Sequence, residues 1–227
     1  MHYSLDLKHV IYRLTFTLLL SAIFGLAVNC VRTQGSTPSS VQEPRVESWM
    51  ADEERILIIY LSRTKNTEAV AEIINDEVGG NMVELILQTP YPENYRAIVA
   101  QVDRENESGY LPPLKTRIEN FRDYDIVFLG FPTWDMQLPP PMKSFLHTYD
   151  FSGKILIPFN TNGGYGVGSG FDDVKELAPD AQILKGLSIK GGLEKEGILL
   201  AIKRERREEV RVQVIEWLRS IKMLEQN

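Results

Sequence analysis

The chain has 227 residues, of which 43% are hydrophobic and 25% are charged. This composition is typical of a globular protein with one ordinary domain and an extension, and it excludes a largely disordered chain. The net charge of −6 argues against a nucleic-acid-binding surface. A single cysteine, Cys30, excludes an intrachain disulfide, and three scattered histidines form no metal-binding motif.

Residues 1–30 resemble an export signal. Lys8 and Arg13 precede an apolar run from Leu14 to Val28, the order found in secretory signals. This run is shorter than the roughly 20 residues of a spanning helix. Because it ends near Cys30, the segment is similar to a bacterial lipoprotein signal, in which that cysteine is lipidated. A signal anchor and a buried helix are the alternatives.

Residues 31–53 are predicted to form a flexible linker. The stretch from Gln34 to Pro44 is rich in Ser, Thr, Pro and Gln, and such segments bury too little apolar surface to fold. We therefore expect an exported protein held at the membrane by its N-terminal segment. The folded domain is expected to span residues 54–224.

A phosphate-binding loop is predicted after the first strand. The apolar run Arg55–Leu61 predicts a strand covered on both faces, and Asn66–Val78 has helical spacing up to Gly79. Hydroxyl and amide side chains crowd the helix start, where bare N–H groups favour an anion. The loop residues are Ser62, Arg63, Thr64, Lys65, Asn66 and Thr67. Ordinary helix capping is the alternative.

An aromatic plate is predicted after the third strand. Met82–Leu87 is the second strand, and the long connection to residue 114 holds a short helix near Tyr95–Arg104. Ile126–Phe131 is the third strand. Pro132, Thr133, Trp134 and Asp135 follow it. Trp134 can stack on a flat heterocycle there, or it can pack under its own loop.

A flexible backbone loop is predicted after the fourth strand. Helix Pro139–Tyr149 leads to strand Lys154–Phe159. The loop that follows contains Thr161, Asn162, Gly163, Gly164, Tyr165 and Gly166. Its glycines let the backbone approach a planar ligand, although a mobile linker has the same composition. The remaining expected elements are helix Ser169–Leu177, a weaker fifth strand Ile183–Ile189 and helix Glu205–Lys222.

Five apolar strands alternating with helices predict an α/β fold, a doubly wound parallel sheet. Ligands bind beyond the carboxyl ends of strands in such sheets. The loops after the first, third and fourth strands therefore meet at one edge. Together they offer phosphate donors, an aromatic ring and flexible backbone, a conjunction more specific than any one loop.

With these loops the chain resembles the flavodoxin-like family. The motifs are SRTKNT at 62–67, YDIVFLGFPTW at 124–134 and FSGKILIPFNTNGG at 151–164. The resemblance implies a five-stranded sheet in order 2-1-3-4-5 and non-covalent FMN. It places the phosphate on Ser62, Thr64, Asn66 and Thr67, and the flavin ring between residues 132–134 and 161–166. Lys65, where the family usually has glycine, and Asp135 depart from the pattern.

The resemblance further implies redox chemistry. The chain is expected to act in electron transfer, or as an FMN-dependent oxidoreductase that uses NAD(P)H or a quinone. Its partner would be a redox protein or a small-molecule acceptor. The backbone near Gly163 or Gly164 is expected to bond the ring, and Asp135 to lower its potential. The alternative is a binding or structural module that has kept the fold and lost FMN.

Overall fold

The structure is a computed structural model that describes residues 53–225. Its strands are β1 (Ile56–Tyr60), β2 (Asn81–Glu84), β3 (Ile126–Pro132), β4 (Ile155–Asn162), β5 (Gln182–Ile183) and β6 (Leu187–Lys190). Its α-helices are α1 (Asn66–Val78), α2 (Tyr95–Ser108), α3 (Pro140–Thr148), α4 (Gly170–Leu177) and α5 (Glu205–Ser220). Short 3-10 helices are η2 (Glu53–Arg55), η3 (Phe121–Asp123) and η4 (Glu194–Glu196).

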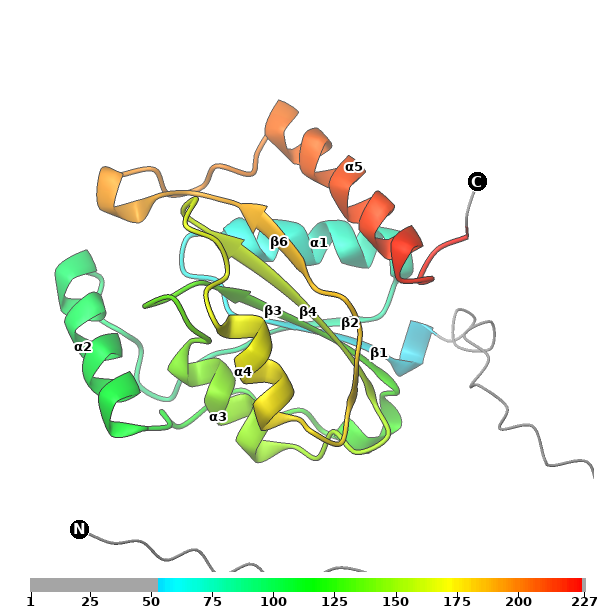
Figure 1. Cartoon of the computed structure of the whole chain (residues 1–227), viewed down its shortest axis with the longest axis horizontal. Coiled ribbons are helices and arrows are strands. Elements are labelled where there is room, and N and C mark those ends of the chain that lie inside the picture. Colours follow the sequence, from blue (N-terminus) through cyan, green and yellow to red (C-terminus); the bar gives the residue numbers. More distant parts are fainter. Residues whose placement is uncertain (1–52, 226–227) are drawn as a thin grey trace, which may run out of the picture. The chain divides into compact units, whose positions relative to one another are not determined.

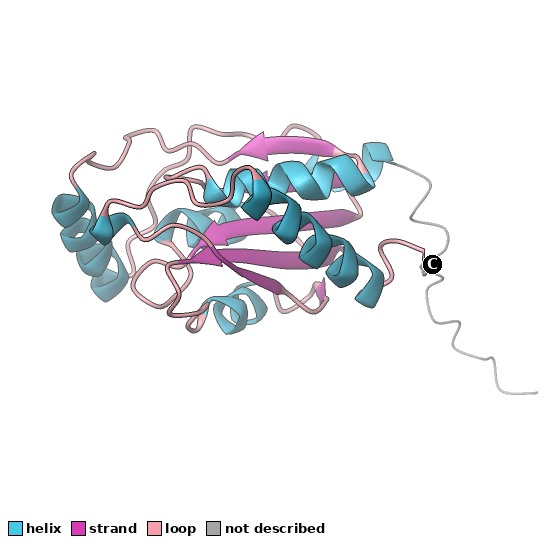
Figure 2. Ribbon diagram, turned by 90° about the horizontal axis from the view of Figure 1, so that it is seen from above, coloured by secondary structure: helices cyan, strands magenta, loops and turns pink. Residues whose placement is uncertain are grey.

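The strands form one parallel sheet in the order β2-β1-β3-β4-β5. This confirms the doubly wound α/β fold and the predicted strand order. Helices cover both faces: Figure 1 shows α1 and α5 above the sheet and α3 and α4 below it. Figure 2, turned by 90°, shows from above that helices cover the strands. Because the strands are parallel, the carboxyl ends of β1, β3 and β4 lie at the same end of the sheet.

The core has two halves, one on each face of the sheet. Alternate residues of β1 point to opposite faces, so Ile56 and Ile58 join α1 and α5, whereas Leu57 and Ile59 join α3 and α4. All of β1 is buried. The prediction of a strand covered on both faces is confirmed.

The prediction of one strand over 183–189 was wrong. Two short strands occupy this segment: β5 pairs with the start of β4, and β6 pairs with its end. Between them the backbone passes against the ring of Phe171, where a Cβ on Gly186 would lie 2.7 Å from the ring. The gap in the ladder lies opposite Pro158 of β4, which has no N–H to donate to this side.

Other boundaries also differ from the predictions. Strand β4 continues to Asn162 instead of ending at Phe159, so the predicted loop residues Thr161 and Asn162 are its last two residues, and α5 ends at Ser220.

The largest differences are in β2 and α2. Strand β2 ends at Glu84, because beyond Leu85 the chain turns to residues 113–116, where Leu87 pairs with Leu114. Helix α2 continues to Ser108 and ends at Gly109, which adopts a left-handed conformation with φ 66°. By contrast, α1 begins and ends where the sequence predicted.

The export segment 1–30, its Cys30 and the linker up to residue 52 lie outside the described residues. Glu53, the last residue of that predicted linker, begins η2. Among residues 53–225, no helix has the length and apolar character needed to cross a bilayer.

Candidate functional site

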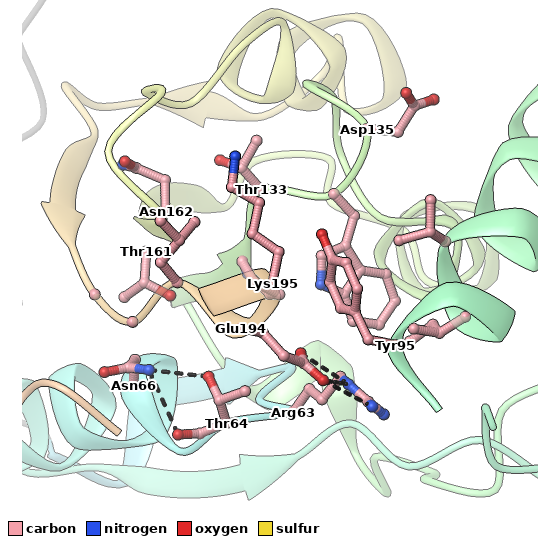
Figure 3. Close-up of a pocket in the computed structure, with 18 of the residues that line it drawn as sticks. Arg63, Thr64, Asn66, Tyr95, Thr133, Asp135, Thr161, Asn162, Glu194 and Lys195 are labelled. Atoms are coloured by element: carbon pink, nitrogen blue, oxygen red, sulfur yellow. Dashed lines mark hydrogen bonds and ion pairs between the residues drawn. The ribbon is translucent and has the colours of Figure 1, made fainter. Parts of the chain in front are cut away.

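A cavity of about 360 Å³ opens at the carboxyl ends of β1, β3 and β4 (Figure 3). Most of the predicted site residues line it: Arg63, Thr64, Asn66, Thr67, Pro132, Thr133, Trp134, Asp135, Thr161, Asn162, Gly163 and Tyr165. Ser62, Lys65, Gly164 and Gly166 belong to the same loops but do not line the cavity. The three predicted loops thus meet around one pocket of the size that small ligands occupy.

The loop after β1 presents a cluster of free backbone donors. Lys65 adopts a left-handed conformation, with φ 66°, directly before α1. The N–H groups of Thr64, Lys65, Asn66 and Thr67 donate to no atom of residues 53–225. Successive N–H groups around a left-handed residue form an anion-binding concavity, here at the positive end of a helix. This geometry suits a phosphate group.

The Lys65 side chain turns to its own helix. Its ammonium lies 2.5 Å from the carboxylate of Glu68, and that bond raises the pKa of Lys65. The ammonium is not part of the cavity wall. Lys65 therefore contributes its backbone conformation to the loop, at the steric cost that a non-glycine residue has with positive φ.

Other polar side chains of the loop hold the site together. Ser62 Oγ accepts a bond from Glu68 N at 3.1 Å and so caps α1. The hydroxyls of Thr67 and Thr161 lie 2.8 Å apart, which joins the first turn of α1 to the end of β4. Helix capping, the alternative explanation for these polar residues, thus accounts for Ser62 but not for the free N–H groups.

Asn66 fixes a more distant segment over the loop. Its Nδ2 donates to Leu199 O at 2.7 Å and to Thr64 Oγ1 at 2.9 Å. Its Oδ1 accepts from Ala201 N and Ile202 N at 2.9 and 3.2 Å. The Asn66 amide is therefore saturated by protein groups, and it orients the hydroxyl of Thr64.

The Arg63 guanidinium connects three parts of the pocket. Its Nε lies 3.0 Å from both carboxylate oxygens of Glu194. Nη1 donates to Pro92 O at 3.1 Å, and Nη2 donates to Glu93 O. Figure 3 shows the Arg63–Glu194 pair beside Thr64. Arg63 lines the pocket, but its donors are already used within the protein.

Trp134 stands in the wall after β3 and packs against another aromatic ring. Its ring meets Tyr91 edge to face, with centroids 5.3 Å apart. Tyr91 donates to Glu105, and burial together with that bond raises the pKa of Tyr91. The contact fixes the Trp134 ring, which is partly exposed to the cavity. Trp134 can therefore pack against Tyr91 and still contact a ligand in the cavity.

Asp135 joins the same wall to α2. Its Oδ2 accepts bonds from Asn106 Nδ2 at 3.1 Å and from Gln137 Nε2 at 3.0 Å. Both donors are neutral amides, so this carboxylate has no ion-pair partner in these two bonds. Thr133 is fixed by its hydroxyl, which donates to Gly166 O at 2.9 Å.

The glycine loop after β4 has an internal scaffold. Asn162 Oδ1 accepts from the N–H groups of Gly164 and Gly166 at 2.8 and 3.2 Å. The N–H groups of Gly163 and Tyr165 donate to no atom of the described part of the chain. The Tyr165 ring is 64% exposed, and its hydroxyl accepts from Lys195 Nζ at 2.6 Å. The loop thus offers free backbone donors on an ordered frame.

Two further segments line the pocket and were not among the predicted site residues. Helix α2 supplies Tyr95, Ile98, Val99, Val102 and Asp103, and the segment after β6 supplies Gly191, Gly192, Leu193, Glu194 and Lys195. The apolar spacing in α2 is that of any helix packed on a core, so it carried no functional signal. The Gly191-Gly192 pair was the one local sign in the second segment.

The flavodoxin family model matches residues 55–203. The chain belongs to the flavodoxin family. Flavodoxins from Synechocystis and Nostoc species are 27% and 28% identical to it over 123 residues. Each alignment covers 52% of this chain and 58% of the relative, so the chain spans little more than half the length of these curated flavodoxins.

Solved structures show the same fold. A protein provisionally assigned as a flavoprotein from Bacteroides uniformis has a TM-score of 0.60 and 22% identity, covering 74% of this chain and 99% of its own. A second, from Bacteroides eggerthii, has a TM-score of 0.59 and 25% identity over 74% of this chain and 98% of its own. A Lactobacillus acidophilus flavoprotein in complex with FMN has a TM-score of 0.54 and 18% identity, covering 60% and 93%.

Proposed function

We propose that this flavodoxin-family protein binds FMN without a covalent link and acts in electron transfer or flavin-dependent reduction. The observation that carries the proposal is the set of free N–H groups from Thr64 to Thr67, because Thr64, Asn66 and Thr67 line the same cavity as Trp134 and the glycine loop. Family membership and an FMN-bound structural neighbour support it.

The residues present fit the three parts of FMN. The N–H groups of residues 64–67 would hold the terminal phosphate, with Thr64 and Thr67 hydroxyls beside them. Trp134 and Thr133 would bound the ring on one side. The free N–H groups of Gly163 and Tyr165 would bond its polar edge. This assignment keeps Ser62, Lys65 and Asn66 as residues that shape the loop rather than as side-chain ligands.

When bound, FMN supplies the redox chemistry, because its ring accepts one or two electrons. The chain's own groups orient the ring and set the charge around it. Asp135 places a negative charge in the wall after β3, which disfavours added electrons on the ring. Either a redox protein or a small molecule would exchange electrons at the open side of the pocket.

Absorbance and binding measurements test this function directly. Protein purified from cells, or apo-protein mixed with FMN, should carry a yellow chromophore and quench the fluorescence of FMN. Riboflavin has the same ring without the phosphate, so it should bind at least about tenfold more weakly if the N–H groups bind phosphate. Absence of bound flavin under excess FMN would leave a binding or structural module on this fold.

Stopped-flow mixing separates the two classes of redox role. Rapid bleaching of the flavin by NADH or NADPH indicates an enzyme that takes hydride from a nicotinamide. A flavin that is bleached only by a reduced redox protein indicates an electron carrier.

We also propose that residues 1–30 export the protein and that Cys30 is lipidated, which would hold the FMN domain at a membrane. The support is the order of basic residues, apolar run and cysteine in the sequence. Membrane fractionation with a radiolabelled fatty acid tests it. Wild type should carry label in the membrane fraction, and Cys30→Ser should lose the label. Equal labelling of both proteins would refute the assignment.

A further inference from the structure

Helix α2 turns its apolar stripe to the pocket. Tyr95, Ile98, Val99, Val102 and Asp103 have the spacing of a single helix face, and all five line the cavity. Ile98 and Val102 are 4% and 3% exposed, yet neither belongs to the core cluster on either face of the sheet. Ile98 and Val102 are thus packed within the protein, and the stripe is open to the cavity mainly through Tyr95 and Val99, with Asp103 partly buried.

Both ends of α2 are fixed by polar contacts, so the protein holds this wall of the pocket in a defined position. At its start, Arg63 Nη1 donates to Pro92 O at 3.1 Å. At its end, Asn106 donates to Asp135 and accepts from Lys143 Nζ at 3.1 Å. Figure 3 shows Tyr95 on the α2 side of the pocket, away from Thr161 and Asn162 on the opposite side.

Two polar groups on the stripe have no partner. The Asp103 carboxylate and the Tyr95 hydroxyl form no hydrogen bond or ion pair with any of residues 53–225. Asp103 is partly buried, next to Val99 and Val102 on the same face. A partly buried carboxylate among apolar side chains binds most favourably a group that brings a positive charge or a hydrogen-bond donor.

The charges nearby favour a cation at this end of the pocket. Asp135 adds a second carboxylate to the lining. Arg63 is paired with Glu194. Lys195 bonds the neutral hydroxyl of Tyr165 and remains a cation, so the lining carries three carboxylates against two cations. Lys143 does not line the cavity, and it donates to the neutral oxygens of Asn106 and Gln137. Asp103 remains the one lining carboxylate without a bonded partner among the described residues.

We propose that the α2 side of the pocket binds a second, small ligand beside the flavin: a ring-sized apolar molecule with a protonated amine that pairs with Asp103. The apolar body would lie on Val99 and the Tyr95 ring. Tyr95 and Val99 are each 39% exposed, so this wall is reached from solvent. The inference rests on the proposed function, because it assigns the loops after β1, β3 and β4 to FMN.

Three probes that share one ring test the ligand class on the FMN-loaded protein. Benzylamine, benzyl alcohol and benzoate differ in the charge of one group, and binding of each is followed by the change in flavin absorbance. Benzylamine should give a saturable change, benzyl alcohol should bind about tenfold more weakly, and benzoate should not bind. No saturable change with benzylamine, or equal binding of the three probes, would overturn the inference.

Two charge variants of α2 locate the contact. Asp103→Asn should weaken benzylamine binding about tenfold and leave benzyl alcohol within about twofold. Glu107→Gln is the matched control, because Glu107 is an exposed residue of the same helix that does not line the cavity. It should leave both probes unchanged.

The affinity for FMN, measured first on each protein, separates this inference from the proposed function. FMN should bind wild type, Asp103→Asn and Glu107→Gln with affinities within about twofold of one another. If Asp103→Asn weakens FMN as much as it weakens benzylamine, the carboxylate serves the flavin and the second site is refuted. If FMN does not bind wild type, the proposed function itself fails.

Discussion

Arg63 and Glu194 form an ion pair, with Nη2 and Oε1 2.9 Å apart, although 131 positions separate them in the chain. Their side chains are 22% and 21% exposed. The pair joins the loop after β1 to the segment after β6, and both residues line the cavity. A carboxylate therefore stands beside the proposed phosphate site, and Arg63 neutralises it.

Removing the guanidinium should penalise the phosphate specifically. In Arg63→Gln the Glu194 charge is left without its partner, and it would repel FMN phosphate. We expect FMN affinity to fall about tenfold or more, and riboflavin affinity to fall no more than about threefold. Quenching of flavin fluorescence measures both.

The double variant Arg63→Gln/Glu194→Gln is the control for that experiment. It should recover most of the lost FMN affinity, because the unpaired charge is gone. If the single variant weakens riboflavin as much as FMN, Arg63 acts by holding the loop and α2 in place rather than by its charge.

Gly168 marks a close approach between the loops after β4 and β3. It has φ 61°, and a Cβ there would lie 1.8 Å from Met136 O. Gly166 has φ 88° with no atom within 4 Å of its added Cβ. Gly168→Ala and Gly166→Ala should both cost about 1 kcal/mol for the strained backbone. Gly168→Ala should cost at least about 1 kcal/mol more, because one loop must move.

Urea unfolding of the two alanine variants measures this difference. FMN affinity should fall in Gly168→Ala, since Trp134 and Tyr165 lie on the displaced loops. Equal free energies of unfolding for the two variants would show that the loops separate without cost.

Substitutions of Lys65 test whether the proposed phosphate site depends on the backbone conformation of Lys65 or on the charge of its side chain. Lys65→Gly removes steric strain of about 1 kcal/mol and an ion pair worth about 0.5 kcal/mol, in which Lys65 is more than half exposed. The free energy of unfolding should therefore stay equal or rise. Lys65→Ala keeps the strain and should be less stable than Lys65→Gly by about 1 kcal/mol.

Both Lys65 variants should bind FMN within about threefold of wild type, since the ammonium contacts Glu68 instead of lining the cavity. A loss of FMN affinity in both variants, with riboflavin affinity unchanged, would instead mean that the ammonium reaches the phosphate.

Tyr60 should make the fold sensitive to alkaline pH. Its side chain is 5% exposed, and burial, with the nearby Glu68, Glu84 and Glu72, raises its pKa to about 12. In the unfolded chain the hydroxyl ionises near pH 10. Below pH 10 the hydroxyl is neutral in both states. Above it the unfolded state loses its proton first, so stability falls from about pH 10 to pH 12.

Urea unfolding at pH 8 and pH 11.5 measures that loss. Other groups also titrate in this range, so the difference between wild type and Tyr60→Phe isolates Tyr60. Wild type should lose about 1–3 kcal/mol more than Tyr60→Phe between the two pH values. Parallel losses in the two proteins would contradict the raised pKa.

The strands and the three loops could be predicted because their signals are local. A continuous apolar run such as residues 55–61 needs burial on both faces, and the strand order then brings the loops after β1, β3 and β4 together. Helix α1 was predicted at both ends because Gly79 follows its last apolar residue.

The other half of the pocket depends on contacts that sequence does not encode locally. Tyr91 meets Trp134, and Glu194 meets Arg63, across long stretches of chain. The stripe on α2 has the same spacing whether it faces a core or a cavity. Likewise, the apolar residues of 183–189 gave no sign that pairing with β4 would stop after Ile183 and restart at Leu187.

The division of the last strand has a consequence for self-association. β5 and β6 together border β4, but each is short, and residues between them leave the ladder. At the opposite border, β2 has four residues. Long, flat edge strands are templates on which identical chains can pair and form fibres. Because the edge strands on both sides of this domain's sheet are short, neither offers a long strand on which another copy could pair, even at high concentration or with an empty pocket.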